Sequence, residues 1–182
     1  GLGGLTYGLS TVEMAAAYAA FPRDGLYSSP YLYTVVTDST GKILLSNGDY
    51  SVKVDENGNA VITGQPTSTA ILSQATTFYM NQMLQHVVTD GTGKLAKLSN
   101  MTAAGKTGTT TNDYDRWFVG YTPYYTAAVW SGYDRQERIN SAGNPSCILW
   151  QKVMSAVSEG ETDIGFNGDL ETTTAYCCTA SG

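Results

Sequence analysis

Hydrophobic and polar residues follow two different periods along this chain, and the changes of period mark its predicted elements. Ser10–Glu13 reads Ser-Thr-Val-Glu, a capping box in which a hydroxyl and a carboxylate satisfy the first N–H groups of a helix. We therefore predict a helix over about 11–21, ended by Pro22 and Gly25. A longer amphipathic helix is predicted from Thr67 to about Thr89, because apolar residues recur there at spacings of three and four.

Runs rich in β-branched and aromatic residues predict strands in the rest of the chain. Ser39-Thr40-Gly41 and Asn57-Gly58 have the turn chemistry of hairpins. Three later strands are separated by short polar links, which imply an antiparallel meander. The expected strands are 31–37 and 43–45, then 51–54 and 60–62, and finally 102–109, 116–121 and 125–133.

A third helix is predicted near the end of the chain. Asn144 and Pro145 are good cap and first-turn residues for a helix over Cys147–Ser158, and Gly160 is expected to end it. Residues 161–182 show no periodicity and are expected to form a polar tail after a domain that covers residues 1–160. Helices around an antiparallel sheet predict the α+β fold class.

Composition and charge exclude several classes of protein. Hydrophobic residues make up 42% of the 182 residues and charged residues 14%, which indicates a packed fold rather than a disordered chain. The net charge is −6, and Lys and Arg are scattered, so we expect no nucleic-acid partner and no contact with an anionic membrane. The longest apolar stretch, Met14–Phe21, is far shorter than the roughly 20 residues of a bilayer span. Any membrane anchor of the parent protein is expected outside residues 1–182.

Cysteine and histidine are too few for several kinds of site. Cys147, Cys177 and Cys178 are too few for a disulfide scaffold, and their pairing and the redox compartment stay open. His86 is the one histidine, so no histidine pair can bind zinc. We expect no metal and no cofactor, and we interpret His86 as a surface or packing residue.

The most informative segment is Ala-Gly-Lys-Thr-Gly-Thr-Thr at residues 104–110. On a strand, the Lys106 ammonium and the hydroxyls of Thr107 and Thr109 can all donate hydrogen bonds to a carboxylate. Gly108 has no side chain, so a substrate backbone can approach closely there. This combination predicts a clamp for an anionic peptide.

Three interpretations of this segment compete, and the simplest is an ordinary surface turn. The second is a nucleotide-binding P-loop, which needs a Gly five residues before Gly105, where Asn100 stands. Gly93-Lys94 fails as well, because Val88 and Leu95 occupy the positions that require Gly and Ser or Thr. The third is the Lys-Thr-Gly element of serine penicillin-recognising enzymes.

A longer match favours the third interpretation. Residues 106–113, Lys-Thr-Gly-Thr-Thr-Thr-Asn-Asp, and 115–123, Asp-Arg-Trp-Phe-Val-Gly-Tyr-Thr-Pro, strongly resemble the third motif and following strand of class A penicillin-binding proteins. Residues 2–8 resemble the segment that leads out of the second motif, and Gly91-Thr92-Gly93 resembles the turn before the Lys-Thr-Gly strand. The resemblance spans about residues 1–160 and implies the carboxy-terminal part of a three-layer transpeptidase domain.

The resemblance also implies a reaction and roles for four residues. In similar enzymes a serine attacks the D-Ala-D-Ala carbonyl of a peptidoglycan stem peptide, and the acyl group then passes to an amine of another stem. Beta-lactams acylate the same serine. Lys106 would set the positive field around this serine, and the hydroxyls of Thr107 and Thr109 would hold the substrate carboxylate. Gly108 would lie against the substrate backbone, and the Thr109 N–H would form half of the oxyanion hole. The parent protein is expected on the outer side of the bacterial cytoplasmic membrane.

The serine nucleophile and the Ser-x-Asn motif of this family are expected upstream of Gly1, in a missing amino-terminal portion of the domain. Ser39-Thr40-Gly41-Lys42 matches Ser-x-x-Lys by letter but falls in a predicted hairpin turn, so we reject it. The chain alone is therefore expected to be inactive. A related beta-lactamase or D,D-carboxypeptidase, and a non-catalytic D-Ala-D-Ala binding module, are the alternatives.

Three expectations concern the sheet. Lys106, Thr107 and Thr109 are expected on an exposed edge strand, with the Lys106 and Thr109 side chains directed to one side. The outer edge of residues 127–131 is expected to be unpaired, because its neighbours would come from the missing portion. The aromatic residues Trp117, Tyr121 and Trp130 are interpreted as packing residues, and Asp115 with Arg116 as a structural pair.

Overall fold

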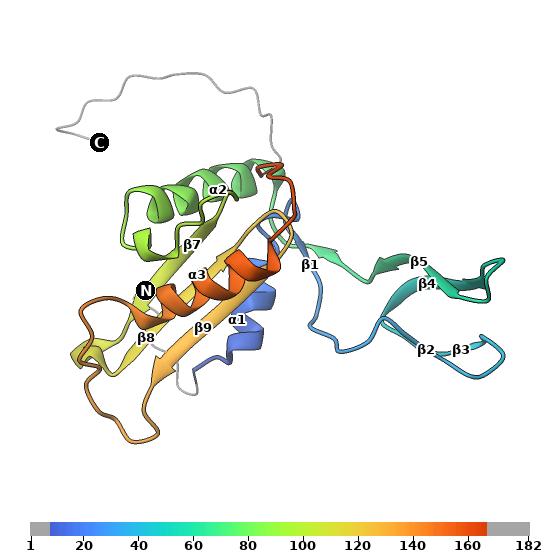
Figure 1. Cartoon of the computed structure of the whole chain (residues 1–182), viewed down its shortest axis with the longest axis horizontal. Coiled ribbons are helices and arrows are strands. Elements are labelled where there is room, and N and C mark those ends of the chain that lie inside the picture. The colour runs from blue at the N-terminus through green and yellow to red at the C-terminus, as the bar shows by residue number, and fades with distance from the viewer. Residues whose placement is uncertain (1–7, 167–182) are drawn as a thin grey trace.

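A computed structural model of the chain describes residues 8–166 and shows a sheet between helices, from which a pair of hairpins projects (Figure 1). The sheet contains β7 (Ala104–Thr109), β8 (Asp115–Tyr121) and β9 (Thr126–Gly132). Helix α1 (Thr11–Tyr18) packs on one face of β8 and β9, and α3 (Pro145–Val157) packs on the other. Together with the flanking α2 (Gln74–Thr89), this arrangement confirms the α+β class.

The predicted helices form where cap residues start them. The Ser10 hydroxyl accepts from the Glu13 N–H at 3.2 Å and the Glu13 carboxylate accepts from the Ser10 N–H at 2.8 Å, so the capping box is confirmed. Asn144 caps α3 as predicted, with its side chain accepting from the Ser146 N–H at 3.0 Å. Helix α1 ends at Tyr18, three residues before the predicted end.

The predicted start of the second helix at Thr67 is wrong. Helix α2 begins at Gln74, and the Ser73 hydroxyl caps it by accepting from the Thr76 N–H at 3.2 Å. The preceding β6 (Thr69–Ala70) pairs instead with β1 (Leu26–Tyr27), more than 40 residues earlier in the chain. This long-range pairing overrides the local helical period of the sequence.

The three central strands form the predicted antiparallel meander in the order β7-β8-β9. Within residues 8–166, the outer edges of β7 and β9 pair with no other strand, so both edge predictions are confirmed. Gly105–Thr109 lie in a regular strand with no register shift, which contradicts the P-loop interpretation.

The core lies mainly between the sheet and α3. Phe118 of β8 and Trp150 of α3 are fully buried and pack edge to face, with ring centroids 5.0 Å apart. A second cluster around Tyr121 lies on the opposite face, where the Tyr121 hydroxyl donates to the Asn81 side chain of α2 at 2.6 Å. Burial in this second cluster raises the pKa of the Tyr121 hydroxyl. The two clusters together place the sheet between two packed layers.

The projecting hairpin arm comprises β2 (Val35–Thr37), β3 (Ile43–Ser46), β4 (Gly48–Val54) and β5 (Ala60–Pro66). β2 pairs with β3, and β4 pairs with β5, as predicted from their turns. No residue from 26 to 76 is buried. The arm therefore adds no residue to the core of the sheet body.

The segment after α3 packs along the body as far as it is described. The Asp163 carboxylate accepts from the N–H and the hydroxyl of Thr102, at 2.9 and 2.7 Å. Phe166 stacks edge to face on Tyr121. The start of the expected tail thus contacts the domain. Residues 167–182, which include Cys177 and Cys178, lie outside the described residues. So do residues 1–7, which include most of the segment at 2–8 that resembles the family. No helix among residues 8–166 is long and apolar enough to span a membrane.

Candidate functional site

A cavity of about 640 Å³ opens on the α1 face of the sheet, beside the Lys-Thr-Gly strand. Helix α1 forms one wall, and the aromatic side chains of β8 and β9 form another. Sequence reasoning identified part of the β7 lining but missed the contribution of α1. The lining residues are Gly8, Leu9, Met14, Tyr18, Lys106, Thr107, Gly108, Thr110, Asp115, Trp117, Val119 and Trp130.

Lys106 supplies the positive charge of this cavity. Its side chain is exposed, and its Nζ donates to the Thr107 carbonyl oxygen at 3.0 Å. Lys106 takes part in none of the ion pairs found among residues 8–166. Its charge is therefore available to an anionic group that enters the cavity.

The backbone of β7 presents alternate residues to its open edge. The Thr110 N–H donates to the Asp115 carbonyl oxygen at 3.2 Å, which makes these two residues a hydrogen-bonded pair of the β7-β8 ladder. Gly108 and Lys106, two and four residues before Thr110, are likewise hydrogen-bonded positions of this ladder. Thr107 and Thr109 are the non-hydrogen-bonded positions between them. The N–H and C=O groups of Thr107 and Thr109 consequently point away from β8, toward the free edge, where an extended peptide can add as a strand.

The expectation that the Lys106 and Thr109 side chains point to one side is wrong. They are three residues apart in a strand whose register opposite Val119 and Arg116 has no bulge. Because side chains alternate between the faces of a strand, Lys106 and Thr109 lie on opposite faces. Lys106 and Gly108 share the cavity face; Thr107 has the same parity as Thr109 but also lines the cavity, whereas Thr109 does not. The backbone N–H of Thr109 still points toward the open edge of β7, whichever face its side chain occupies.

Thr107 is tied to the turn that follows α2. Its Oγ1 lies 2.7 Å from the Oγ1 of Thr92, within hydrogen-bonding distance. Gly91-Thr92-Gly93 was identified from the sequence as a turn before the strand, but the sequence did not indicate that its hydroxyl reaches the clamp. The contact joins two residues 15 positions apart.

Asp115 connects three elements around the cavity. Its carboxylate accepts from the Trp130 indole Nε1–H at 2.8 Å and from the Thr110 hydroxyl at 3.0 Å. The predicted pair of Asp115 with Arg116 is wrong, since Arg116 pairs with Asp113 at 3.0 Å. Strand alternation explains the correction, because neighbouring residues of a strand face opposite sides.

The aromatic residues play different parts. Tyr121 is fully buried, as predicted for a packing residue. Trp117 and Trp130 are register partners on β8 and β9 and also line the cavity, so they were only partly described as packing residues. Trp130 is 41% exposed. These two indoles give the cavity an apolar wall.

His86 and Cys147 lie apart from the cavity. The His86 side chain is largely exposed on α2 and lies 3.5 Å from the Asp90 carboxylate. Cys147 is buried in the core under α3, where burial raises the pKa of its thiol to about 11. In the described part of the chain, no three His, Cys, Asp or Glu residues are grouped to hold a metal ion.

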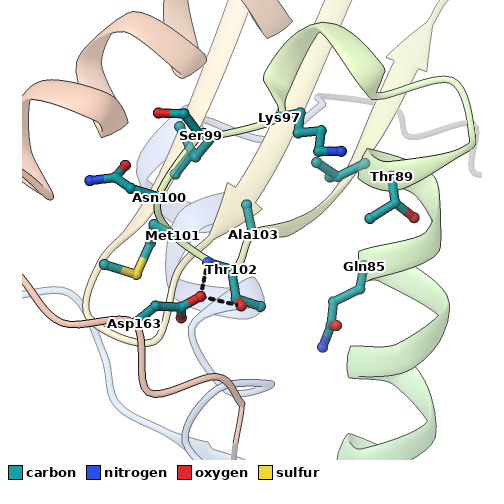
Figure 2. Close-up of a pocket in the computed structure, with 11 residues that line it drawn as sticks. Gln85, Thr89, Lys97, Ser99, Asn100, Met101, Thr102, Ala103 and Asp163 are labelled. Carbon is teal, nitrogen blue, oxygen red and sulfur yellow. Dashed lines mark hydrogen bonds between the residues drawn. The ribbon is translucent and has the colours of Figure 1, made fainter.

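A second cavity of about 380 Å³ lies between α2 and the loop that precedes β7. Figure 2 shows Asp163 beneath this loop, hydrogen-bonded to Thr102, while Gln85 and Thr89 approach from α2. The cavity is lined by none of the clamp residues. We therefore place the candidate site in the larger cavity beside Lys106.

The sequence and the fold are both similar to those of known proteins. The penicillin binding protein transpeptidase domain matches residues 1–143. Penicillin-binding protein 1A of Clostridium acetobutylicum is 38% identical over 148 residues, which cover 81% of this chain and 16% of that protein. Penicillin-binding protein 4 of Bacillus subtilis is 32% identical over 157 residues, covering 85% of this chain and 22% of that protein. The chain thus spans a minor part of each relative.

Two crystal structures share the fold. The D,D-transpeptidase domain of a peptidoglycan glycosyltransferase from Eggerthella lenta is 26% identical with a TM-score of 0.55, and the match covers 80% of this chain and 31% of that one. Penicillin-binding protein 1A from Haemophilus influenzae has a TM-score of 0.63 at 21% identity, covering 90% of this chain and 28% of that one. At that identity the second likeness concerns the fold alone.

Proposed function

The chain belongs to the family of penicillin binding protein transpeptidase domains, and from this premise we propose that it supplies the carboxylate-binding strand of a peptidoglycan D,D-transpeptidase. The observation that carries the proposal concerns residues 8–166, in which the outer edge of β7 is unpaired beside a cavity whose ammonium group, Lys106, takes part in no ion pair. An extended D-Ala-D-Ala stem peptide adds to this edge as a strand.

Each clamp residue has a physical role in this proposal. Lys106 provides the positive field around the nucleophile, and the Thr107 hydroxyl donates to the terminal carboxylate of the peptide. Gly108 allows close approach of the substrate backbone. The open-edge N–H of Thr109 stabilises the oxyanion that forms on the attacked carbonyl, a contribution worth roughly a hundred- to thousandfold in rate for one such donor.

The nucleophilic serine of the proposed reaction lies on polypeptide other than residues 1–182. The Ser39–Lys42 sequence is in the exposed turn between β2 and β3, on the projecting arm and outside the lining of the cavity. The serine attacks the penultimate D-Ala carbonyl, the terminal D-Ala leaves, and an amine of another stem resolves the acyl-enzyme. The same serine opens a beta-lactam ring, whose carboxylate takes the place of the peptide carboxylate.

The remaining polypeptide also covers surfaces that this chain exposes. The outer edge of β9 is unpaired within the described residues, and Trp130 on that strand is 41% exposed. Leu149 and Val153, four residues apart on α3, are exposed as well. We propose that strands and helices of the amino-terminal part of the domain pack here, in a parent protein that acts outside the cytoplasmic membrane.

Labelling with a fluorescent penicillin tests the proposal. The chain alone is expected to form no covalent adduct by intact mass, and the full-length polypeptide is expected to form a long-lived one. Lys106→Ala in the full-length protein should slow acylation by about a hundredfold or more. Lys53→Ala, which removes an exposed lysine from the arm, is the matched control and should leave acylation unchanged.

Three results would contradict this function. A stoichiometric adduct on the isolated chain would place the nucleophile within residues 1–182. Equal acylation of the Lys106→Ala and Lys53→Ala proteins would remove Lys106 from the site. Rapid release of the acyl group with turnover of the antibiotic would identify a beta-lactamase rather than a transpeptidase.

A further inference from the structure

Thr92 contacts the clamp residue Thr107 but does not line the cavity. Its Oγ1 is 2.7 Å from the Oγ1 of Thr107, and either oxygen can donate in this hydrogen bond. Thr107 is half-buried and does line the cavity. One hydroxyl of the clamp is therefore connected to a residue outside the lining of the cavity.

The turn that carries Thr92 is held tightly to the end of α2. The Gly91 N–H donates to the His86 carbonyl oxygen and the Gly93 N–H to the Val87 carbonyl oxygen, both at 2.9 Å. A Cβ at Gly91 would come within 2.8 Å of the Val87 Cα, and one at Gly93 within 3.2 Å of a Phe118 ring carbon. Thr92 is consequently presented to β7 from a turn that packs without spare space.

The hydroxyl pair has two possible directions of donation. If Thr107 donates to Thr92, its hydrogen is used and only its lone pairs remain available to other groups. If Thr92 donates to Thr107, the Thr107 hydrogen is free to donate to an anion. A carboxylate in the cavity stabilises the second arrangement, and the two hydrogen bonds then lie in series and polarise each other.

We propose that Thr92 is a positioning residue for carboxylate recognition, which acts by donating to Thr107 and so directing the Thr107 hydroxyl at the substrate carboxylate. This inference rests on the proposed function of the clamp. It deepens that function by adding a residue that never touches the substrate. It also gives the Gly91-Thr92-Gly93 turn a chemical role besides joining α2 to the strand.

The test compares two forms of one beta-lactam in the full-length polypeptide: the free carboxylate and its methyl ester. The ratio of their acylation rate constants reports how strongly the carboxylate is recognised. Thr92→Val keeps the shape of the side chain and removes the hydroxyl, and it should lower this ratio roughly five- to tenfold. Thr92→Ser keeps the hydroxyl and should restore the ratio to within about twofold of the wild-type value.

The result for the ester separates positioning from general damage. Acylation by the ester should be nearly unchanged in Thr92→Val, because the ester does not use the carboxylate site. An equal loss for both forms, or no loss for either, would overturn the proposal. In the Thr92→Val/Thr107→Val double variant, the ratio should fall no further than in Thr107→Val alone, since the two residues act in series.

Thr107→Val also distinguishes failure of this inference from failure of the proposed function. If Thr107→Val leaves the ratio at the wild-type value, the carboxylate site itself is wrong. If Thr107→Val lowers the ratio but Thr92→Val does not, the carboxylate site stands and the positioning role is wrong.

Discussion

The sheet body and the hairpin arm are both built from antiparallel strands joined by short turns, yet different forces stabilise them. In the body, residues such as Phe118 and Trp150 are fully buried between β8 and α3. In the arm, no residue is buried, and exposed apolar side chains such as Val54 and Ile62 project from its strands. Burial of apolar area thus supports the body, while the arm depends on local hydrogen bonds.

Those local hydrogen bonds repeat in the two hairpin turns. Asp38 accepts from the N–H groups of Thr40 and Lys42, at 2.9 and 3.1 Å. Asp55 accepts in the same way from Asn57 and Asn59, at 2.9 and 2.7 Å. Each aspartate reproduces part of a backbone turn with its side chain. The comparison teaches that one strand geometry can result from core packing or from turn chemistry.

Truncation of a core aromatic residue should give the largest difference between the regions. Phe118→Ala removes a fully buried ring and is expected to cost about 3–5 kcal/mol of the free energy of unfolding. Ile62→Ala in the arm should change it by no more than about 0.5 kcal/mol. Urea unfolding of the two variants measures both values. Similar losses would mean that the arm shares the core of the body.

Addition of a methyl group to a glycine sharpens the same contrast. A Cβ at Gly105 would lie 2.6 Å from a Phe118 ring carbon and 2.7 Å from the Val119 carbonyl oxygen, so Gly105→Ala should cost about 1–3 kcal/mol. A Cβ at Gly58 meets no atom within 4 Å, but Gly58 has φ of +82°. Gly58→Ala should therefore cost about 1 kcal/mol, and only within the arm.

Two measurements, the thermal unfolding midpoint and amide hydrogen exchange, distinguish a global effect of Gly105→Ala from a local effect of Gly58→Ala. Gly105→Ala should lower the global midpoint and the protection of amides in all three strands of the sheet. Gly58→Ala should reduce protection only in β4 and β5. Equal global effects would contradict the independence of the arm.

Aspartate substitutions compare side-chain hydrogen bonds in the two regions. Asp115→Ala removes the acceptor of the Trp130 indole and of the Thr110 hydroxyl, and should cost about 1–2 kcal/mol in the partly exposed wall of the cavity. The tryptophan fluorescence of the Asp115→Ala protein should also change, because the Trp130 indole loses its hydrogen-bond acceptor. Asp55→Ala is the matched variant, and its effect should be confined to the β4-β5 hairpin. An unchanged unfolding midpoint for Asp115→Ala would show that Asp115 does not stabilise the cavity wall.

Acid should produce the smallest effect, and it should be specific to the arm. Hydrogen bonds from backbone and side-chain donors of their turns lower the pKa values of Asp38 and Asp55 from the usual 3.8. Because the folded-state pKa is the lower one, this stabilisation is present above pH 3.8 and is lost as the pH falls through the folded-state values. The protection factors of amides in the two turns, which correct for the intrinsic pH dependence of exchange, should therefore fall below about pH 4. An Asp55→Asn protein should lack that fall in the β4-β5 turn.

Local patterns in the sequence predicted much of this molecule. The capping box at Ser10–Glu13, the Asn144 cap and the hairpin turn at Asn57-Gly58 act within a few residues, and the structure contains all three features. The Lys-Thr-Gly strand and its meander also follow from short-range patterns, because strands joined by brief polar links tend to pair with their neighbours along the chain. The roles assigned to the clamp residues stay predictions.

Contacts between distant residues were decided by the tertiary structure. The Thr92–Thr107 hydrogen bond, the Asp115–Trp130 hydrogen bond and the attachment of Asp163 to Thr102 each join residues that are separated by 15 or more positions. No period or cap signals such contacts, because they depend on how α2, the sheet and the segment after α3 pack together. The start of α2 shifted for the same reason, since the long-range pairing of β1 with β6 satisfies backbone groups that a longer helix would use.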